Sequence, residues 1–503
     1  MNIKRFLVAG WIGNSIAVLT GALLTLAFAP FNLYPLAIIC PALLLSLWLF
    51  VNPKHAFLRG WLFGIGLFGT GIYWVFHSVY AYGNASAWLA SLITGGFVAL
   101  LALFPASCGY LLVRFFPYHY STKLMAAFPT LWVLLEWVRS WLFSGFPWLL
   151  IGSSQIDSPL RGYAPLVSVY GVSLAAVISS GLIVNAILQA KQERRRICYV
   201  NLLLLVALWI IGEGFSFIQW TQPKQSPIKV SLVQGNIPEH LNWSVEEIEP
   251  TLEHYQQLSA AHWDSQLVIW PEGAVPISLQ ESTEFLDEIN QIAKQHHATF
   301  ITGIPVRSGT GLGYYNGVIA LGEGKGYYLK RRLVPFGEYT PLSFIFNPIL
   351  HFLHIPAFNY LIPAQVKMQP ISTNGLRISS FICYEIAFPE QVLTRDGNIN
   401  LLLTVNNDAW FGHSIAEAQH LQMAQMRAIE LARPVLFVSN DGMTAVVNAK
   451  GKIQSIAPQY QSFVLTDWVQ ATVGKTPLQR FALDPLFLLL LFLVFISIRQ
   501  QRQ

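Results

Sequence analysis

Three ionisable side chains stand at or just after short strand-like runs in the second half of the 503-residue chain. Glu272 belongs to the run VIWPEG, Lys330 begins KRRLVPFGEY, and Cys383 follows ISSFI. Ligands of open α/β sheets bind beyond the carboxyl ends of the strands, so catalytic side chains are expected at these positions. Each residue also has a structural interpretation. Glu272 could be a turn carboxylate, and Lys330 could be one of three basic surface residues with its two arginine neighbours.

Cys383 is the only cysteine between Gln219 and the C-terminus. The other three lie in or at the edge of long apolar segments, where a thiol is most often a small buried hydrophobe; they are Cys40, Cys108 and Cys198. Paired cysteines stabilise domains in oxidising compartments, yet Cys383 has no partner in this part of the sequence. Its thiol is therefore either buried and inert or a nucleophile.

Acid–base chemistry could join the three groups into one nucleophilic site. A free thiol has a pKa of about 8.5 and needs a base or a nearby cation to attack as a thiolate. Glu272 could take the proton, while Lys330 could favour the thiolate and then stabilise the oxyanion of a tetrahedral intermediate. General-base assistance of this kind is worth roughly 10²–10⁴ in rate.

The elements that must position these residues begin at Pro227, where long apolar runs give way to short ones separated by polar stretches. Strand-like runs occupy 229–237, 266–270, 299–306, 378–383, 400–405 and 435–440, and helix-like segments occupy 245–265, 283–296 and 416–432. Alternation of strands and helices predicts a layered α/β fold.

A polar, loop-rich insert spans roughly 339–374 and carries large apolar side chains. They are Phe344, Phe346, Leu350, Phe352, Leu353, Phe358 and Leu361. Such apolar content in a loop outside the core suggests a lid or a membrane-touching element. Burial in the core of the domain itself is the alternative.

The rest of the chain has the composition of a membrane protein. It is 53% hydrophobic with a mean hydropathy of +0.46, and only 11% of its residues are charged, where about 25% is usual. A helix needs about 20 apolar residues to cross a bilayer. Eight segments are candidates: 7–29, 33–51, 60–76, 87–113, 124–138, 163–190, 197–217 and 481–498. The fifth is short and contains Glu136, which shares a helix face with Arg139 and could be offset by it.

The positions of the basic residues predict the orientation in the membrane. Lys and Arg precede the first segment and follow the second, fourth, sixth and eighth, whereas the loops 30–33 and 77–86 contain none. The positive-inside rule therefore places both termini in the cytoplasm and residues 218–480 outside, which in a bacterium is the periplasm. Arg139 and Arg161 are exceptions. The net charge of +5 reflects this topology, so we expect no nucleic-acid partner.

The order Glu, Lys, Cys in the contexts VIWPEG and FICYEIAFPE resembles the nitrilase-type C–N hydrolase superfamily. The chain is more closely similar to the apolipoprotein N-acyltransferase family, which places such a domain between membrane spans. The resemblance covers the entire chain and is reinforced by VQGNIPEHLNW, LVPFGEYTP, VNNDAWFG and SNDGMTAVV. It implies seven transmembrane helices in 1–217, an αββα sandwich of the nitrilase type in 218–480, and an eighth transmembrane helix in 481–503.

The resemblance also implies roles for particular residues. It makes Glu272, Lys330 and Cys383 a catalytic triad, with the spacing to Pro-Phe-Gly-Glu selecting Lys330 over its arginine neighbours. It makes Glu338 a second essential acid, which would keep Lys330 charged and aimed. Residues implied to support the site or contact substrate are Trp243, Tyr384 and Glu385.

The activity that the resemblance implies is a ping-pong acyl transfer. Cys383 would attack the sn-1 ester of a phospholipid, with phosphatidylethanolamine as the expected donor, and form a thioester. The α-amine of the N-terminal diacylglyceryl-cysteine of an apolipoprotein would then accept the acyl chain. A transferase must exclude water until that amine arrives. The stretch WLFSGFPWLL (141–150) could line the lipid entrance or could be an interfacial anchor.

Other functions fit the sequence less well. A membrane-anchored amidase could use the same triad, but a small soluble substrate would require only one anchor. A transporter would place ionisable groups deep in its spans, where only Glu136 is an acid. The glycine-rich SGTGLGYYNG is read as a hairpin loop because no Gly-Lys-Ser/Thr follows it. We expect no cofactor and no metal, since the sequence has no zinc-ligand spacing. A serine nucleophile is also not expected, because the motif Gly-x-Ser-x-Gly is missing.

Overall fold

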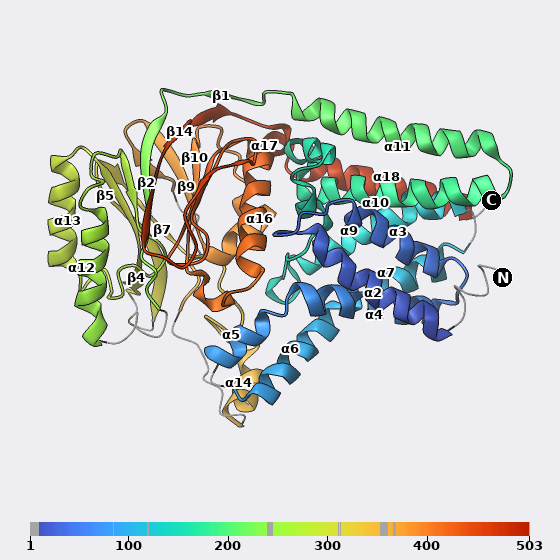
Figure 1. Ribbon diagram of the computed structural model, residues 1–503, viewed down its shortest axis with the longest axis horizontal. Coiled ribbons are helices and arrows are strands. Elements are labelled where there is room, and N and C mark those ends of the chain that lie inside the picture. The colour runs from blue at the N-terminus through green and yellow to red at the C-terminus, as the bar shows by residue number, and fades with distance from the viewer. Residues whose placement is uncertain are drawn as a thin grey trace. The chain divides into compact units, whose positions relative to one another are not determined.

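The computed structural model of the chain describes residues 10–83, 85–117, 120–238, 245–309, 311, 313–352, 361–365 and 369–501. By its internal contacts the chain forms two compact units (Figure 1). One contains Met1–Phe76, Ala87–Ile218 and Arg480–Gln503, and the other contains His77–Ser86 and Gln219–Gln479.

The second unit is built on two large mixed sheets. The first has six strands in the order β14 (Phe463–Val469), β2 (Ile228–Gln234), β3 (Leu267–Ile269), β4 (Thr299–Arg307), β5 (Tyr314–Gly322) and β7 (Tyr327–Leu329). The second has seven, in the order β13 (Ile453–Ile456), β12 (Ala445–Val447), β11 (Val435–Ser439), β10 (Leu401–Asn406), β9 (Leu376–Ile382), β8 (Ile371–Thr373) and β6 (Gly324–Lys325). A separate antiparallel pair joins β1 (Thr221–Pro223) to β15 (Thr472–Gly474). The inner strands β2, β3 and β4 are parallel, as are β9, β10 and β11.

The period-two pattern of these strands explains how the sheets stack. Leu401, Leu403 and Val405 of β10 point into a core that also contains Val230 and Leu232 of β2. Alternate side chains on the same strands point to the outer faces, because successive residues of a strand face opposite sides. The two sheets therefore pack against each other through one shared apolar layer.

Helices cover both outer faces. α12 (Ile248–Ser259) and α13 (Thr283–Gln295) pack on the six-stranded sheet, with Leu252, Tyr255 and Ile289 buried against it. α16 (Ala416–Leu431) covers the seven-stranded sheet. Figure 1 shows this order of layers, with α12 and α13 on one side and α16 on the other. The unit is an αββα sandwich, as the family resemblance implied. Its short helices are α14 (Ser343–Phe352) and α15 (Pro389–Val392), with 3₁₀ turns η6 (Val245–Glu247), η7 (Cys383–Ala387) and η8 (Asp408–Phe411).

The first unit is helical. Its longer helices are α2 (Gly10–Leu24), α3 (Leu36–Trp48), α4 (Pro53–Gly71), α6 (Ala87–Leu101), α7 (Leu103–Phe115), α9 (Phe128–Arg139), α10 (Ala164–Lys191), α11 (Arg195–Ser216) and α18 (Asp484–Gln501). Short pieces are η1 (Thr25–Ala27), α8 (Tyr120–Thr122), the π-helical η2 (Lys123–Ala127), η3 (Leu142–Ser144), η4 (Ile151–Gln155) and η5 (Pro159–Tyr163). α5 (Val75–Ala81) and α17 (Pro477–Phe481) lie where the chain passes between the units.

Glycines let α2, α4 and α7 approach closely. A Cβ on Gly21 would lie 1.9 Å from the Phe63 carbonyl oxygen, and one on Gly60 would lie 2.4 Å from that of Pro105. Small residues at helix contacts are typical of membrane bundles, where van der Waals packing holds the helices together. The glycine-rich composition of these helices therefore serves packing.

The number of helices that could span a membrane differs from the predicted eight. Among the described residues four helical stretches are long and apolar enough, namely Gly10–Ala27, Ala87–Phe115, Pro159–Lys191 and Arg195–Ser216. A fifth is possible if Pro53–Gly71 and Val75–Ala81, which are bent by 57° at their junction, form one span. The predicted segment 33–51 yields only the 13-residue α3, with Pro41 inside it, and 124–138 yields a π-helical turn and the 12-residue α9. The prediction of eight spans is therefore not confirmed.

Candidate active site

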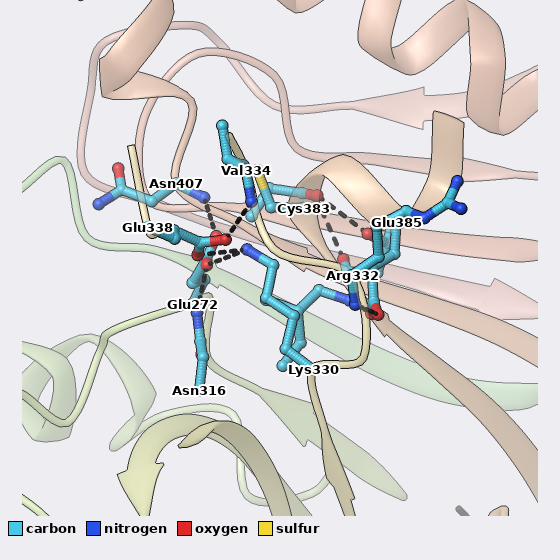
Figure 2. A network of polar contacts seen from close by, with 12 residues as sticks. Glu272, Asn316, Lys330, Arg332, Val334, Glu338, Cys383, Glu385 and Asn407 are labelled. Carbon is cyan, nitrogen blue, oxygen red and sulfur yellow. Dashed lines mark hydrogen bonds and ion pairs between the residues drawn. The ribbon is translucent and has the colours of Figure 1, made fainter. Parts of the chain in front are cut away.

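The predicted site residues converge at the carboxyl ends of strands from both sheets. Glu272 follows β3, Lys330 follows β7, and Cys383 follows β9. Figure 2 shows Lys330 pointing toward Glu272 and Glu338, with Cys383 beside this group and Glu385 on the side away from the two acids. Strand ends are rigid, so they fix the origin of each side chain.

Lys330 is the centre of a buried charge network. Its side chain is 1% exposed, and its Nζ donates to Glu338 Oε1 at 2.6 Å and to Glu272 Oε1 at 3.4 Å. Burial alone would lower the pKa of Lys330, but the two carboxylates raise it above its ordinary value. The side chain is therefore an ammonium held between two acids.

The two acids are themselves held by neutral donors. Glu272 Oε1 accepts from Asn316 Nδ2 at 2.7 Å, and its Oε2 accepts from the Asn407 backbone N–H at 3.0 Å. Glu338 Oε2 accepts from the Val334 backbone N–H at 2.7 Å. Burial raises the pKa of Glu272, with Lys330 opposing the rise and Glu338 adding to it. A carboxylate with a raised pKa is a stronger base than one in water.

Cys383 sits at a strained turn between β9 and η7. Its φ is +50°, a left-handed conformation that is uncommon for a residue other than glycine. The residue is 9% exposed. Burial raises the pKa of its thiol well above the ordinary value, the Glu272 carboxylate raises it further, and Lys330 opposes both. The resting group is thus a thiol, and its proton must leave as the sulfur attacks.

Glu385 joins the segment of Lys330 to the segment of Cys383. Its fully buried carboxylate accepts hydrogen bonds from two places in the chain. The donors are the backbone N–H groups of Arg331 (2.8 Å), Arg332 (3.0 Å) and Ile382 (3.0 Å), the Tyr328 hydroxyl (2.8 Å) and Gln391 Nε2 (3.2 Å). With every contact directed at the scaffold, this geometry suits positioning.

The two remaining predicted residues are Tyr384 and Trp243. Tyr384 is buried next to Cys383, and its ring meets that of Phe388 edge to face with centroids 4.8 Å apart. Trp243 lies outside the described residues.

Several residues of the site were missed by reasoning from the sequence. Asn316 lies on β5, in a stretch read as a loop, and Asn407 contributes a backbone N–H, which carries no side-chain signal. His420 on α16 contacts the Cys383 carbonyl oxygen at 3.1 Å through its Nε2. The motif VNNDAWFG contains Asn407 but reinforced only the family resemblance, and the fold alone brings His420 of α16 to the nucleophile.

Within the part of the chain that the structure describes, no group of three or more His, Cys, Asp or Glu side chains could hold a metal ion. The expectation that no metal takes part stays a prediction.

Two protein families match this chain. Residues 20–182 match the apolipoprotein N-acyltransferase N-terminal domain, and residues 229–477 match the carbon-nitrogen hydrolase domain. Proteins named apolipoprotein N-acyltransferase are similar over nearly the whole length. One from Coxiella burnetii is 43% identical over 489 residues, covering 96% of this chain and all of the relative. Those from Methylococcus capsulatus and Azotobacter vinelandii are each 40% identical, covering 92% and 95% of this chain and 91% and 93% of the relatives.

Proposed function

This chain belongs to the apolipoprotein N-acyltransferase family, and on that premise we propose that it works by double displacement at Cys383. It is an acyltransferase of lipoprotein biosynthesis in a bacterial membrane. The proposed donor is a phospholipid, with phosphatidylethanolamine expected, and the proposed acceptor is the α-amine of an N-terminal diacylglyceryl-cysteine. The observation that carries the proposal is the buried Lys330 ammonium held by two carboxylates beside the Cys383 thiol.

In the first half-reaction Glu272 accepts the thiol proton as the Cys383 sulfur attacks the sn-1 ester carbonyl. The raised pKa of the thiol makes a free thiolate rare, so proton transfer and attack occur together. Lys330 faces the oxyanion that forms and stabilises it in a site of low dielectric. The lysophospholipid alkoxide then leaves with the proton from Glu272, and the acyl chain stays on sulfur as a thioester.

In the second half-reaction the α-amine of the lipoprotein attacks the thioester carbonyl. Glu272 takes one proton from the amine and returns it to the Cys383 sulfur as the sulfur leaves, so the products are an amide and the original thiol. The burial of Lys330 and Cys383 supports exclusion of water between the two halves. Glu338 keeps Lys330 charged in both, and Glu385 holds the two segments in place. Tyr384 and Trp243 are proposed to support the site or contact substrate.

We further propose a membrane domain of seven helices in 1–217, a periplasmic catalytic domain in 218–480 and an eighth helix in 481–503, with cytoplasmic termini. The asymmetry of basic residues between the loops supports this orientation. The contact boundaries near Ile218 and Arg480 support the division of the chain.

The first test is the intact mass of the purified protein after incubation with phosphatidylethanolamine and no acceptor. We expect a gain of one fatty-acyl mass that neutral hydroxylamine removes. Cys383→Ala should show no gain, while Cys198→Ala, a matched loss of another thiol, should behave as wild type. An unchanged wild-type mass across several phospholipids would contradict the thioester scheme. Release of free fatty acid with no stable adduct would indicate a hydrolase instead.

A further inference from the structure

A loop outside the predicted triad holds both the base and the nucleophile. The loop 407–412 follows β10 and begins with Asn407, whose backbone N–H donates to Glu272 Oε2 at 3.0 Å. The Asn407 side chain in turn accepts from the Ala409 N–H and begins the 3₁₀ turn η8. The position of this one backbone N–H therefore helps to set the position of the base.

The next residue of the loop reaches the nucleophile through a histidine. Asp408 Oδ1 lies 3.1 Å from His420 Nδ1, and His420 Nε2 lies 3.1 Å from the Cys383 carbonyl oxygen. A peptide carbonyl can only accept a hydrogen bond, so His420 Nε2 carries a hydrogen and is the donor to the Cys383 carbonyl. Asp408 and His420 are both fully buried. Asp408 and His420 therefore fix the peptide carbonyl of Cys383, whose φ is +50°, and so stabilise this strained turn.

Residues from a distant part of the sequence also contact the loop. They come from segment 77–86, which belongs to the same compact unit as the loop. The Ser78 hydroxyl donates to the Trp410 carbonyl at 2.6 Å, and the Tyr82 hydroxyl donates to the Ala409 carbonyl at 3.1 Å. The Tyr82 ring also packs on the Trp410 ring, with centroids 4.6 Å apart.

The fit at the end of the loop is equally close. Gly412 has a φ of +57°, and a Cβ there would lie 2.7 Å from the His77 ring. A glycine is required both by the backbone and by this contact. His77, Ser78 and Tyr82 therefore pack directly on the part of the loop from Ala409 to Gly412.

We propose that Ser78 and Tyr82 are positioning residues of the acyl transfer, acting through loop 407–412 on Glu272 and Cys383 together. In these contacts the two hydroxyls donate to backbone carbonyls of the loop. The loop in turn contacts the base Glu272 and His420, the histidine that is hydrogen-bonded to the Cys383 carbonyl. Small displacements of reacting groups are costly, since about 1 Å can cost on the order of 10²-fold in rate. The inference rests on the proposed function for its chemistry.

The test is the double variant Ser78→Ala/Tyr82→Phe, which removes both hydroxyls and keeps the aromatic ring at position 82 that packs on Trp410. We expect the single-turnover rate of Cys383 thioester formation to fall by about tenfold or more, with little change in KM for phospholipid. The rate at which iodoacetamide alkylates Cys383, measured across pH, should fall as well, because it reports on the base and the nucleophile without lipid. The matched control is Ser91→Ala/Tyr199→Phe, which removes one hydroxyl from α6 and one from α11.

A histidine series separates positioning from simple loss of structure. His420→Ala should slow alkylation as the double variant does, and His420→Gln, whose amide can donate to the Cys383 carbonyl, should recover part of the rate. Rates equal to the control in the double variant would overturn the proposal, as would a rise in KM alone. A wild-type protein that forms no thioester would contradict the proposed function, whereas the alkylation rates would still test this inference.

Discussion

At the residue scale, the site is an arrangement of charges that only the fold brings together. Glu272, Lys330 and Cys383 could be selected from the sequence because each follows a strand-like run and stands in a recognisable context. The family resemblance also implied the supporting acids Glu338 and Glu385, but other partners could not be selected from the sequence. Asn407 acts through its backbone, and His420 lies in a helix whose other side chains are also buried, so neither has a local signal.

The charge on Lys330 depends on Glu338, so Glu338→Gln should impair chemistry more than binding. The amide removes a charge-assisted hydrogen bond of 2.6 Å, and such bonds contribute about 1.5–3 kcal/mol. We expect thioester formation to slow by about 10- to 100-fold. The exposed Glu323→Gln is the control, and a Glu338→Gln protein with the wild-type rate would exclude this role.

Glu417 should make the stability of the second unit depend on pH. It is buried and accepts hydrogen bonds from the Tyr460 hydroxyl and Gln459, and burial raises its pKa from 4.5 to about 8. Between these two values the folded chain keeps a proton that the unfolded chain has released. The free energy of unfolding therefore falls as pH rises from about 4.5 to about 8.

Thermal unfolding in detergent tests this linkage. The neutral variant Glu417→Gln should lose less stability than wild type between pH 5 and pH 8, by a difference in Tm of about 5 °C. The exposed Glu253→Gln should keep the wild-type pH dependence. Parallel curves for wild type and Glu417→Gln would show that the carboxyl does not titrate in this range.

At the element scale, the inner strands were predictable and the outer ones were not. The six predicted runs correspond to β2, β3, β4, β9, β10 and β11, which are buried on both faces and therefore read as continuous apolar stretches. β5 was read as part of a loop because its start follows a glycine-rich stretch. β13 is largely exposed and β14 buries only Leu465 and Val469, so their side chains give little apolar signal, and pairing with neighbouring strands defines them.

The insert 339–374 contains a helix that the sequence did not predict. α14 has Pro348 inside it, which usually argues against a helix, and Phe344 and Phe352 are 77% and 79% exposed. Burial in the core of the domain is therefore wrong for these two rings. Leu353 and Phe358 lie outside the described residues. The exposed face of α14 supports the interpretation as a lid or a membrane-touching element.

Removing the two exposed rings should weaken contact with lipid. Burying one such ring contributes about 1.5–3 kcal/mol when complete, so partial insertion of both predicts a rise in KM for vesicle phospholipid of about tenfold in Phe344→Ser/Phe352→Ser. Alkylation of Cys383 by iodoacetamide should not change. Phe463→Ser, which removes a half-exposed ring from β14, is the control, and an unchanged KM would exclude a lipid contact.

At the scale of the whole molecule, composition was enough to distinguish an apolar helical part of the chain from an α/β part. It was not enough to count the spans. Apolar runs such as 33–51 and 124–138 fold into short or irregular helices packed among others, because a buried helix of a membrane bundle needs neither full length nor a lipid-facing surface.

The proposed orientation can be tested at the two ends of α11. Cysteines introduced as Lys191→Cys and Gln222→Cys lie at exposed positions before and after that helix. In intact cells an impermeant maleimide should label Gln222→Cys after removal of the outer membrane, and should label Lys191→Cys only after lysis. Cys198 should be replaced by alanine in both. Labelling of Lys191→Cys from outside would reverse the topology.

The carboxylate of Glu385 has a mechanical consequence for an enzyme with two bulky substrates. Five donors from two chain segments converge on it, so the strand end that carries the ammonium and the turn that carries the sulfur share one anchor and lose their independent freedom of motion. We therefore expect the two segments to move together as one rigid piece. On the proposed mechanism, we expect donor and acceptor to enter and leave through motion of the surroundings, while the distances between the reacting groups stay the same throughout the cycle.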